Sequence, residues 1–510
     1  MKPMAATAND SAKVSHVRRW LVPVFCGAVS LAVVWLVWGG VAPAPAIHDE
    51  LAYVLQCDIF ARGRWFAAPP PIPEFFEQFY VFVRGFVASR YWPGHSLVLT
   101  PGCVIGMPSV IPLLLIACTG SLIFVLARRI ASQEVALVAW ALWLTSAAAL
   151  ELRATYLSHN TTSLLWLVAL WQLDRWATRK SHVSLAIVGA VMGALAITRP
   201  LTAVGLGLAI AACIAREAWL RGSIKPLAVA AVPALLLLGV IPLWNSATLG
   251  DWRRVPYWAY TRQYSPFDQP GVQFNSAEAL AELPIDMRRH AEDVIPHFER
   301  HTISNLPAIA ANRALAVARA LGSGWRLCLW PFVLLGWWTL RRRSGIKVAM
   351  ASAVGLFLTH LIYPHPPSWV AYYLEVFPLF HVAAAAGLVE ALNRARVERS
   401  VRLALLAPAL VMAVTDVYTA HVHRQRWQAH VANPQRVWAS IPEAQAIVFV
   451  RFGPSLNLAF GLVRNSANLP AERIWAVRDR GERNEELRRH APHRAAYLYE
   501  TESMRLTKLN

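Results

Sequence analysis

Charged residues are scarce in this chain. They make up 15% of its 510 residues, whereas hydrophobic residues make up 56% and the mean hydropathy is +0.38. A soluble domain carries about 25% charged residues. Apolar runs recur along the sequence and approach the roughly 20 residues that cross a bilayer. The sequence therefore predicts a polytopic membrane protein.

The chain also lacks the signatures of several functional classes. Its six cysteines are scattered and no CxxC occurs, which predicts neither a disulfide framework nor a zinc site. It has no Walker loop, no GxGxxG and no GxSxG elbow, which disfavours an ATP-driven pump and a serine hydrolase. His297 and His301 have metal-ligand spacing, but Glu299 is misplaced for the zinc protease pattern. We therefore expect no metal site.

Positive charge is plentiful, with a formal net charge of +19, yet its placement argues against a nucleic-acid partner. Lys and Arg cluster in short segments between apolar runs, as the positive-inside rule expects of cytoplasmic turns. Residues 1–19 are polar, and no small-residue cleavage site follows the next apolar run, so we expect that run to be retained. We expect a multi-pass protein of the cell membrane, a bacterial inner membrane, with its N-terminus cytoplasmic and its C-terminus extracytoplasmic.

The predicted fold is an α-helical membrane domain over residues 1–420, followed by a small extracytoplasmic α/β domain over residues 421–510. Two large loops, 42–101 and 245–320, lie outside in this topology. The tail is expected to form strands at 444–450, 474–478 and 495–499 and a helix at 485–490. Eleven spans are expected, at 20–41, 103–127, 133–150, 158–173, 183–198, 201–215, 226–244, 321–340, 347–363, 371–390 and 403–420.

The first outside loop begins with an acidic pair, Asp49 and Glu50, directly after the first span. A carboxylate at the membrane surface, flanked by Ile47 and Leu51, can have a raised pKa and act as a general base. Alternatively, Asp49 caps the start of a helix. The two interpretations are compatible, because a capping position still aims the side chain into the loop.

Several outside segments together resemble the GT-C superfamily of polytopic glycosyltransferases, most of all its branch of protein O-mannosyltransferases and lipid A aminoarabinose transferases. The resemblance covers about residues 15–390. It rests on the acidic pair and on the order of four further segments: Tyr91 to Leu97, Leu152 to His159, Ala194 to Pro200, and Asn245 to Asp251. A histidine, His48, stands where such proteins often have a proline.

The resemblance implies an enzyme that moves a sugar, hexosyl or pentosyl, from a polyprenyl-phosphate donor to a hydroxyl of a lipid, glycan or protein on the extracytoplasmic face. Asp49 is then the base, with Glu50 as second choice. No resident cofactor is expected. The candidates for binding the donor phosphate are Arg199, Arg84, Arg90 and His95, and those for lining the substrate cavity are Tyr53, Tyr91, His159, His365, Tyr372 and Tyr373.

Purely structural interpretations compete with several of these roles. Arg199 could extend to lipid headgroups, and His159 could be an ordinary interfacial histidine. Glu375 lies within an apolar run and needs a partner, for which an arginine at a neighbouring span end is suited. At the level of the whole protein, the alternative is a secondary transporter or lipid-sugar flippase. That class typically shows inverted repeats and midspan ionisable residues. Here no repeat is found, and most ionisable residues lie at the outer ends of spans.

Overall fold

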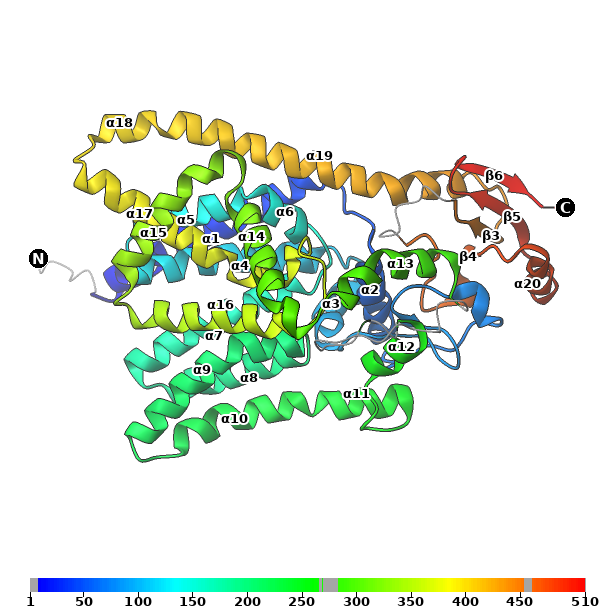
Figure 1. The fold of residues 1–510 in the computed structure, drawn as a ribbon, viewed down its shortest axis with the longest axis horizontal. Coiled ribbons are helices and arrows are strands. Elements are labelled where there is room, and N and C mark those ends of the chain that lie inside the picture. Colours follow the sequence, from blue (N-terminus) through cyan, green and yellow to red (C-terminus); the bar gives the residue numbers. More distant parts are fainter. Residues whose placement is uncertain (1–7, 266–267, 269–282, 454–460, 510) are drawn as a thin grey trace, which may run out of the picture.

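The computed structural model describes residues 8–265, 268, 283–453 and 461–509. Long helices run side by side in a bundle, and a small sheet lies at the end of the molecule far from the N-terminus (Figure 1). The principal helices of the bundle are α1 (Ala8–Val37), α4 (Val110–Ile130), α5 (Gln133–Leu144), α6 (Ala147–Arg153), α7 (His159–Arg179), α8 (His182–Ala196), α9 (Pro200–Leu220), α10 (Lys225–Leu238), α11 (Val240–Leu249), α14 (Leu306–Gly322), α15 (Trp330–Leu340), α16 (Ser344–Leu361), α17 (Phe377–Arg394), α18 (Arg399–Ala404) and α19 (Leu406–Ala439).

In the described part of the chain, seven helical segments are long and apolar enough to cross a membrane. An eighth is added if α5 and α6, which are bent by 70° at their junction, count as one span. The apolar α8 has only 15 residues. The polytopic helical fold is thus confirmed, whereas the number of eleven spans stays a prediction.

The second predicted span, 103–127, begins later in the structure than predicted. Helix α3 (Gly94–Val104) ends before a short turn, and α4 begins only at Val110. Gly106 in this turn has a φ of +71°, a conformation that favours glycine, and Pro108 cannot donate a helical hydrogen bond. The segment that carries His95 is therefore a separate helix, outside the span that follows it.

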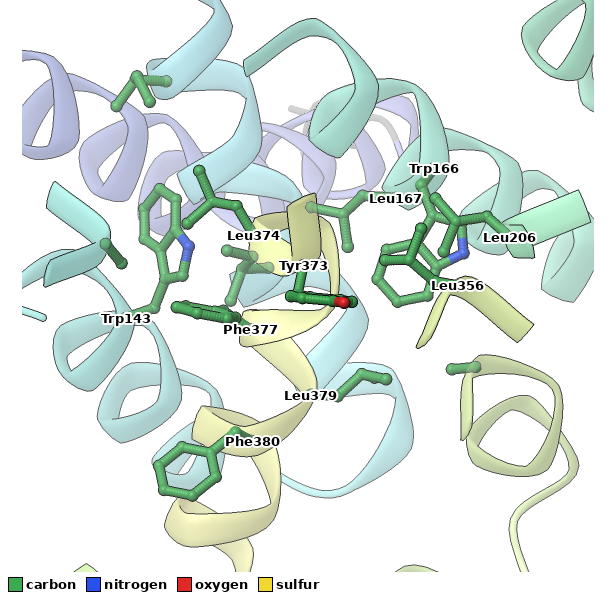
Figure 2. Packing of buried hydrophobic residues seen from close by; sticks show 14 of the residues in the cluster. Trp143, Trp166, Leu167, Leu206, Leu356, Tyr373, Leu374, Phe377, Leu379 and Phe380 are labelled. Carbon is green, nitrogen blue, oxygen red and sulfur yellow. The ribbon is translucent and has the colours of Figure 1, made fainter. Parts of the chain in front are cut away.

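The bundle core combines close helix contacts with buried aromatic side chains. A Cβ added to Gly336 of α15 would lie 1.8 Å from the carbonyl oxygen of Ala383 in α17, so only glycine lets these helices approach so closely. Figure 2 shows Tyr373 and Phe377 between Trp143 on one side and Leu356 on the other. This packing holds the segment leading into α17 against α5 and α16.

The C-terminal sheet has the strand order β4-β3-β5-β6. Strand β3 (Ala446–Arg451) is parallel to both β4 (Ile474–Arg478) and β5 (Ala495–Glu500), and β6 (Arg505–Lys508) is antiparallel to β5. The three strands and the helix predicted in the tail are confirmed, the last as α20 (Asn484–His490). Helix α19, however, continues past residue 420 to Ala439 and carries the chain to the sheet.

Helices from the two large loops, 42–101 and 245–320, lie between the bundle and the sheet (Figure 1). They are α2 (His48–Ala61) and α3 from the first loop, with α12 (Pro256–Tyr264) and α13 (Ile285–Glu299) from the second. Residues 269–282 of the second loop lie outside the described residues. Arg478 of β4 joins these layers, because it pairs with Asp286 of α13 and donates a hydrogen bond to the Glu77 carbonyl.

Candidate active site

The two acidic residues at the start of α2 have different surroundings. Ile47 is the N-cap, and the Glu50 carboxylate accepts hydrogen bonds from the backbone N–H groups of Ala46 at 2.8 Å and Ile47 at 3.2 Å. Its other oxygen accepts from the N–H of Tyr156 at 2.9 Å and lies 3.5 Å from the Arg424 guanidinium. Glu50 is fully buried and holds the helix start in place.

Asp49 is the second residue of the helix, so the prediction that it might be the N-cap is wrong. Its carboxylate accepts a hydrogen bond of 2.5 Å from the Tyr91 hydroxyl. Burial raises the pKa of Asp49, and the Tyr91 hydrogen bond and the charges of Arg90 and Arg199 only partly offset this effect. A carboxylate that has a raised pKa and, unlike Glu50, does not hold several backbone N–H groups is suited to accept a proton.

The aromatic residues of the first loop form the wall beside Asp49. The rings of Tyr53 and Tyr91 stack with centroids 4.7 Å apart, and the Tyr53 hydroxyl donates to Ser158 at 3.1 Å. His95 packs edge-on against Tyr53 at 4.8 Å. The first loop thereby contacts the segment that begins α7.

Both ring nitrogens of His95 have protein partners. Nε2 lies 2.7 Å from the Tyr156 carbonyl oxygen and Nδ1 lies 2.8 Å from the Thr161 hydroxyl. The carbonyl can only accept, so Nε2 carries the proton and Nδ1 accepts from Thr161. Burial lowers the pKa of His95 to about 4. A neutral, fully engaged imidazole anchors α3 and leaves no free donor for a phosphate.

Gly94 explains how the first loop reaches Arg199. Its N–H donates to the Ile197 carbonyl at 2.9 Å, and an added Cβ would lie 2.4 Å from the Thr198 hydroxyl. Only glycine therefore fits between the two segments. Through this contact α3 abuts the residues that immediately precede Arg199.

Arg199 is the N-cap residue of α9 and is followed by Pro200 at the first helical position. Its side chain is 12% exposed and lies 3.5 Å from the Glu375 carboxylate, with the guanidinium 5.2 Å from the centre of the Tyr372 ring. Glu375 also accepts from Thr162 at 2.6 Å. The predicted need of Glu375 for an arginine partner is confirmed, and Arg199 packs against protein groups.

Unusually many buried polar atoms around Arg199 have no hydrogen-bond partner among the described residues. They include Nη1 of Arg199, Oε2 of Glu375 and both ring nitrogens of His159. His159 packs edge-on to Tyr372 at 6.4 Å. Buried polar groups normally have partners, so this cluster is suited to a polar ligand with several oxygen atoms.

The other two phosphate candidates are already paired. Arg90 is buried, lies 2.8 Å from the Asp268 carboxylate, and packs 3.9 Å from the centre of the Tyr80 ring. Arg84 is half exposed and pairs with Glu77 at 2.8 Å. Arg90 and Arg199 are both buried and both keep guanidinium nitrogens without a hydrogen-bond partner among the described residues. Arg199 is the one of the two that lies against Glu375 and Tyr372, and both add positive charge near Asp49.

The segment before α17 supplies aromatic side chains to the same region. Tyr372 packs 4.7 Å from His365, whose Nε2 lies 3.2 Å from the Tyr373 hydroxyl. Buried Arg313 donates to the carbonyls of His360, Tyr363 and His365 and so fixes the turn that carries them. The sequence predicts a role for neither Arg313 nor Asp268, because no local pattern around them distinguishes them from other residues of the second large loop.

A disulfide joins Cys57 of α2 to Cys103 of α3 across a sequence separation of 46 residues. The sequence predicted no disulfide framework, because cysteine spacing alone does not show which residues meet. Four other cysteines are free. The described residues hold no group of three or more His, Cys, Asp or Glu side chains that could bind a metal ion. That the protein works without a resident metal stays a prediction of the sequence.

No protein-family model and no curated protein sequence matches this chain. Among solved structures, the chain is similar to ArnT from Cupriavidus metallidurans bound to undecaprenyl phosphate, with a TM-score of 0.52 at 12% identity over 94% of this chain and 93% of ArnT. Apo ArnT gives a TM-score of 0.44 at 14% identity over 95% and 93%. The apo Archaeoglobus fulgidus oligosaccharyltransferase gives 0.43 at 12% identity over 85% and 63%.

The first of these likenesses extends over nearly the whole of both chains, and at 12% identity it establishes the fold alone. The chain thus has an ArnT-like fold, a polytopic helical membrane domain with a small C-terminal sheet domain. The prediction of fold class is confirmed. The particular branch is not, because no sequence match supports it.

Proposed function

We propose that this chain is a membrane glycosyltransferase that transfers a sugar, hexosyl or pentosyl, from a polyprenyl-phosphate donor to a hydroxyl acceptor on the extracytoplasmic face. The observation that carries the proposal is that Asp49 and Arg199 lie close enough for the charge of Arg199 to act on the pKa of Asp49. One supplies a base of raised pKa and the other a buried cation with an unfilled hydrogen-bonding position. The ArnT likeness supports the choice of donor, since that structure is bound to undecaprenyl phosphate.

In the proposed reaction, Asp49 accepts the proton of the acceptor hydroxyl, whose oxygen attacks the anomeric carbon of the donor. The bond from that carbon to the phosphate oxygen breaks, and the polyprenyl phosphate leaves with the electron pair. Arg199 stabilises the charge that develops on the leaving phosphate, and His159 and Tyr372 bound the same space. The activated donor makes a nucleotide site unnecessary.

The extracytoplasmic location rests on two independent features. The positive-inside bias puts the loop 42–101 outside. The disulfide between Cys57 and Cys103 lies in the same loop and at its end, and disulfides persist in oxidising compartments. The acceptor, a lipid, glycan or protein hydroxyl, therefore reaches Asp49 from the extracytoplasmic side.

The proposal is tested by replacing each acid separately, as Asp49→Asn and Glu50→Gln, in the full chain in membranes. Donor turnover is followed as release of polyprenyl phosphate from pentose, hexose and amino-sugar carriers. We expect Asp49→Asn to lose about 10²–10⁴-fold in rate at unchanged folding, the usual contribution of a general base. Glu50→Gln should mainly lower thermal stability.

Parental turnover by folded Asp49→Asn would overturn the assignment of the base. If the parent protein moves the intact lipid-linked sugar across vesicles and turns over none of the donors, the chain is a flippase and the enzyme proposal fails.

A further inference from the structure

A cavity lies on the side of α2 that faces away from Asp49. Asp58 follows Asp49 by nine residues, which at about 100° per residue places the two carboxylates on opposite sides of the helix. Asp58 lines the cavity together with Leu51, Val54 and Leu55, whereas Asp49 does not. One helix thus separates the candidate active site from this space.

The cavity is formed where the membrane domain meets the sheet domain. Its volume is about 660 Å³, within the roughly 300–1,000 Å³ typical of ligand pockets. Besides α2, it is lined by the end of α19 at Gln435 and Trp438, by β4 at Ile474, and by the α3–α4 turn at Pro108. Four separate parts of the fold therefore converge on it.

The polar side chains of the cavity are mixed and balanced in charge. Two arginines, Arg464 and Arg473, stand against two acids, Asp58 and Glu472. Neutral amide and hydroxyl groups complete the polar lining, from Gln78, Gln435, Asn465 and Ser466. A site without excess charge favours a neutral ligand over a phosphate or a cation. Because its lining offers many hydrogen-bond donors and acceptors, the site suits a ligand that is rich in hydroxyl groups.

Existing contacts leave two of these amides available. The side chain of Asn465 is committed to the backbone of Ala476, since it both donates and accepts there. Arg464 donates to the Pro45 carbonyl at 3.1 Å. Gln78 and Gln435 both line the cavity and are only partly buried, so their amides can turn toward a ligand.

One side of the cavity, formed by the α3–α4 turn, adjoins an exposed apolar surface that can face membrane lipid. Cys103, Gly106 and Pro108 line it, and the residues between them are exposed and apolar: Val104 is 65% exposed and Ile105 63%. An apolar turn at the outer end of the α4 span lies where a membrane lipid would meet the protein. A ligand in the cavity can therefore keep an apolar chain in the membrane.

From these features we propose that the cavity between α2, α19 and β4 binds the saccharide head of a membrane glycolipid, at a site separate from that of sugar transfer. The apolar wall made by Leu51, Val54 and Trp438 suits the C–H faces of a sugar ring, and the amides suit its hydroxyls. The site does not require the proposed reaction. Its occupant would reach α2 on the face opposite Asp49.

The test uses the full chain in nanodiscs and measures binding of dodecyl glycosides with glucose, galactose, mannose, maltose or N-acetylglucosamine heads. Gln435→Trp fills the cavity, and Asn433→Trp is the matched control, because Asn433 is an exposed neighbour on α19 that does not line it. We expect at least one glycoside to bind, at least tenfold more weakly to Gln435→Trp and unchanged to the control.

Two comparisons distinguish the sources of affinity. If a free sugar such as maltose binds and Gln435→Trp weakens its binding, the saccharide alone is recognised. If only the dodecyl glycoside binds, the alkyl chain in the bilayer contributes to the affinity. If dodecyl dimethylamine oxide, which has no sugar, competes equally well, the site recognises an alkyl chain and the proposal fails. It also fails if no glycoside binds, or if both tryptophan variants bind like the parent.

Discussion

The Tyr91 hydroxyl donates a hydrogen bond of 2.5 Å to the Asp49 carboxylate, although 42 residues separate them in the chain. This bond lowers the pKa of Asp49 against the larger opposing effect of burial. It therefore tunes the proton affinity of the proposed base. It also ties the start of α2 to the segment that leads into α3.

Removing that bond should move the acidic limb of the pH profile. In Tyr91→Phe the pKa of Asp49 rises further. Because the base must be ionised, turnover of the donor should begin to decline at a higher pH than in the parent as the pH is lowered. A hydrogen bond to a charged group contributes about 1.5–3 kcal/mol, so turnover on the acidic limb should be roughly tenfold lower or more. The pH dependence of kcat/KM measures this.

Tyr53→Phe is the matched control for the position of that limb, because the Tyr53 hydroxyl donates to Ser158 and not to Asp49. An acidic limb that stays in place in Tyr91→Phe would contradict the assignment of Asp49 as the base.

Arg199 should govern affinity for the lipid phosphate. Arg199→Gln removes a charge-assisted contact, so undecaprenyl phosphate should bind about 10–100-fold more weakly. Arg254→Gln, which changes an exposed arginine of the second outside loop, should bind like the parent. Quenching or calorimetric titration in nanodiscs measures the dissociation constants. Equal affinity of the folded Arg199 variant and the parent would place the phosphate elsewhere.

Gly94 should tolerate no side chain. Gly94→Ala puts a Cβ into the Thr198 hydroxyl and the Ile197 carbonyl, and we expect a loss of about 1–3 kcal/mol in stability, the usual cost of overpacking. Gly345→Ala is the control, since no heavy atom lies within 4 Å of its added Cβ. Thermal unfolding in detergent compares the two, and similar melting temperatures would contradict the tight contact.

The bond between Cys57 and Cys103 should protect both thiols from alkylation. In protein purified without reductant, a maleimide polymer should label neither residue, whereas exposed Cys328 should react. Closing a loop of this length limits the unfolded chain, so Cys57→Ser with Cys103→Ser should lose about 4 kcal/mol or less of stability. Labelling of Cys57 without reductant would show that the two residues are not bonded.

The sequence predicted the elements of the sheet domain well, because each strand is a short apolar run bounded by polar residues. Strand β4 occupies Ile474–Arg478, the same residues as the prediction, and β5 extends only one residue further. Local pattern was less informative for α19. Its outer half is rich in polar residues, yet the helix continues through them to Ala439 because packing against the first loop supports it.

The candidate site was predicted in its residue types and less well in their roles. Resemblance alone made Asp49 the base and Glu50 the second choice, and only the positions of Ala46 and Tyr156 show that Glu50 is engaged by backbone donors. Likewise, nothing local indicates that Asp268 pairs with Arg90. Such partners come from distant segments, so their pairing depends on the fold.

Helix α19 has 34 residues, which at about 1.5 Å per residue corresponds to a length of about 51 Å. The hydrocarbon core of a bilayer is only about 30 Å thick. The remaining part of the helix therefore acts as a rigid spacer of about 20 Å between the membrane and the sheet. Arg424 fastens this spacer to Glu50. The sheet domain is consequently held at a fixed distance from the bundle, and that distance sets the thickness of the layer of α2, α3, α12 and α13 between them.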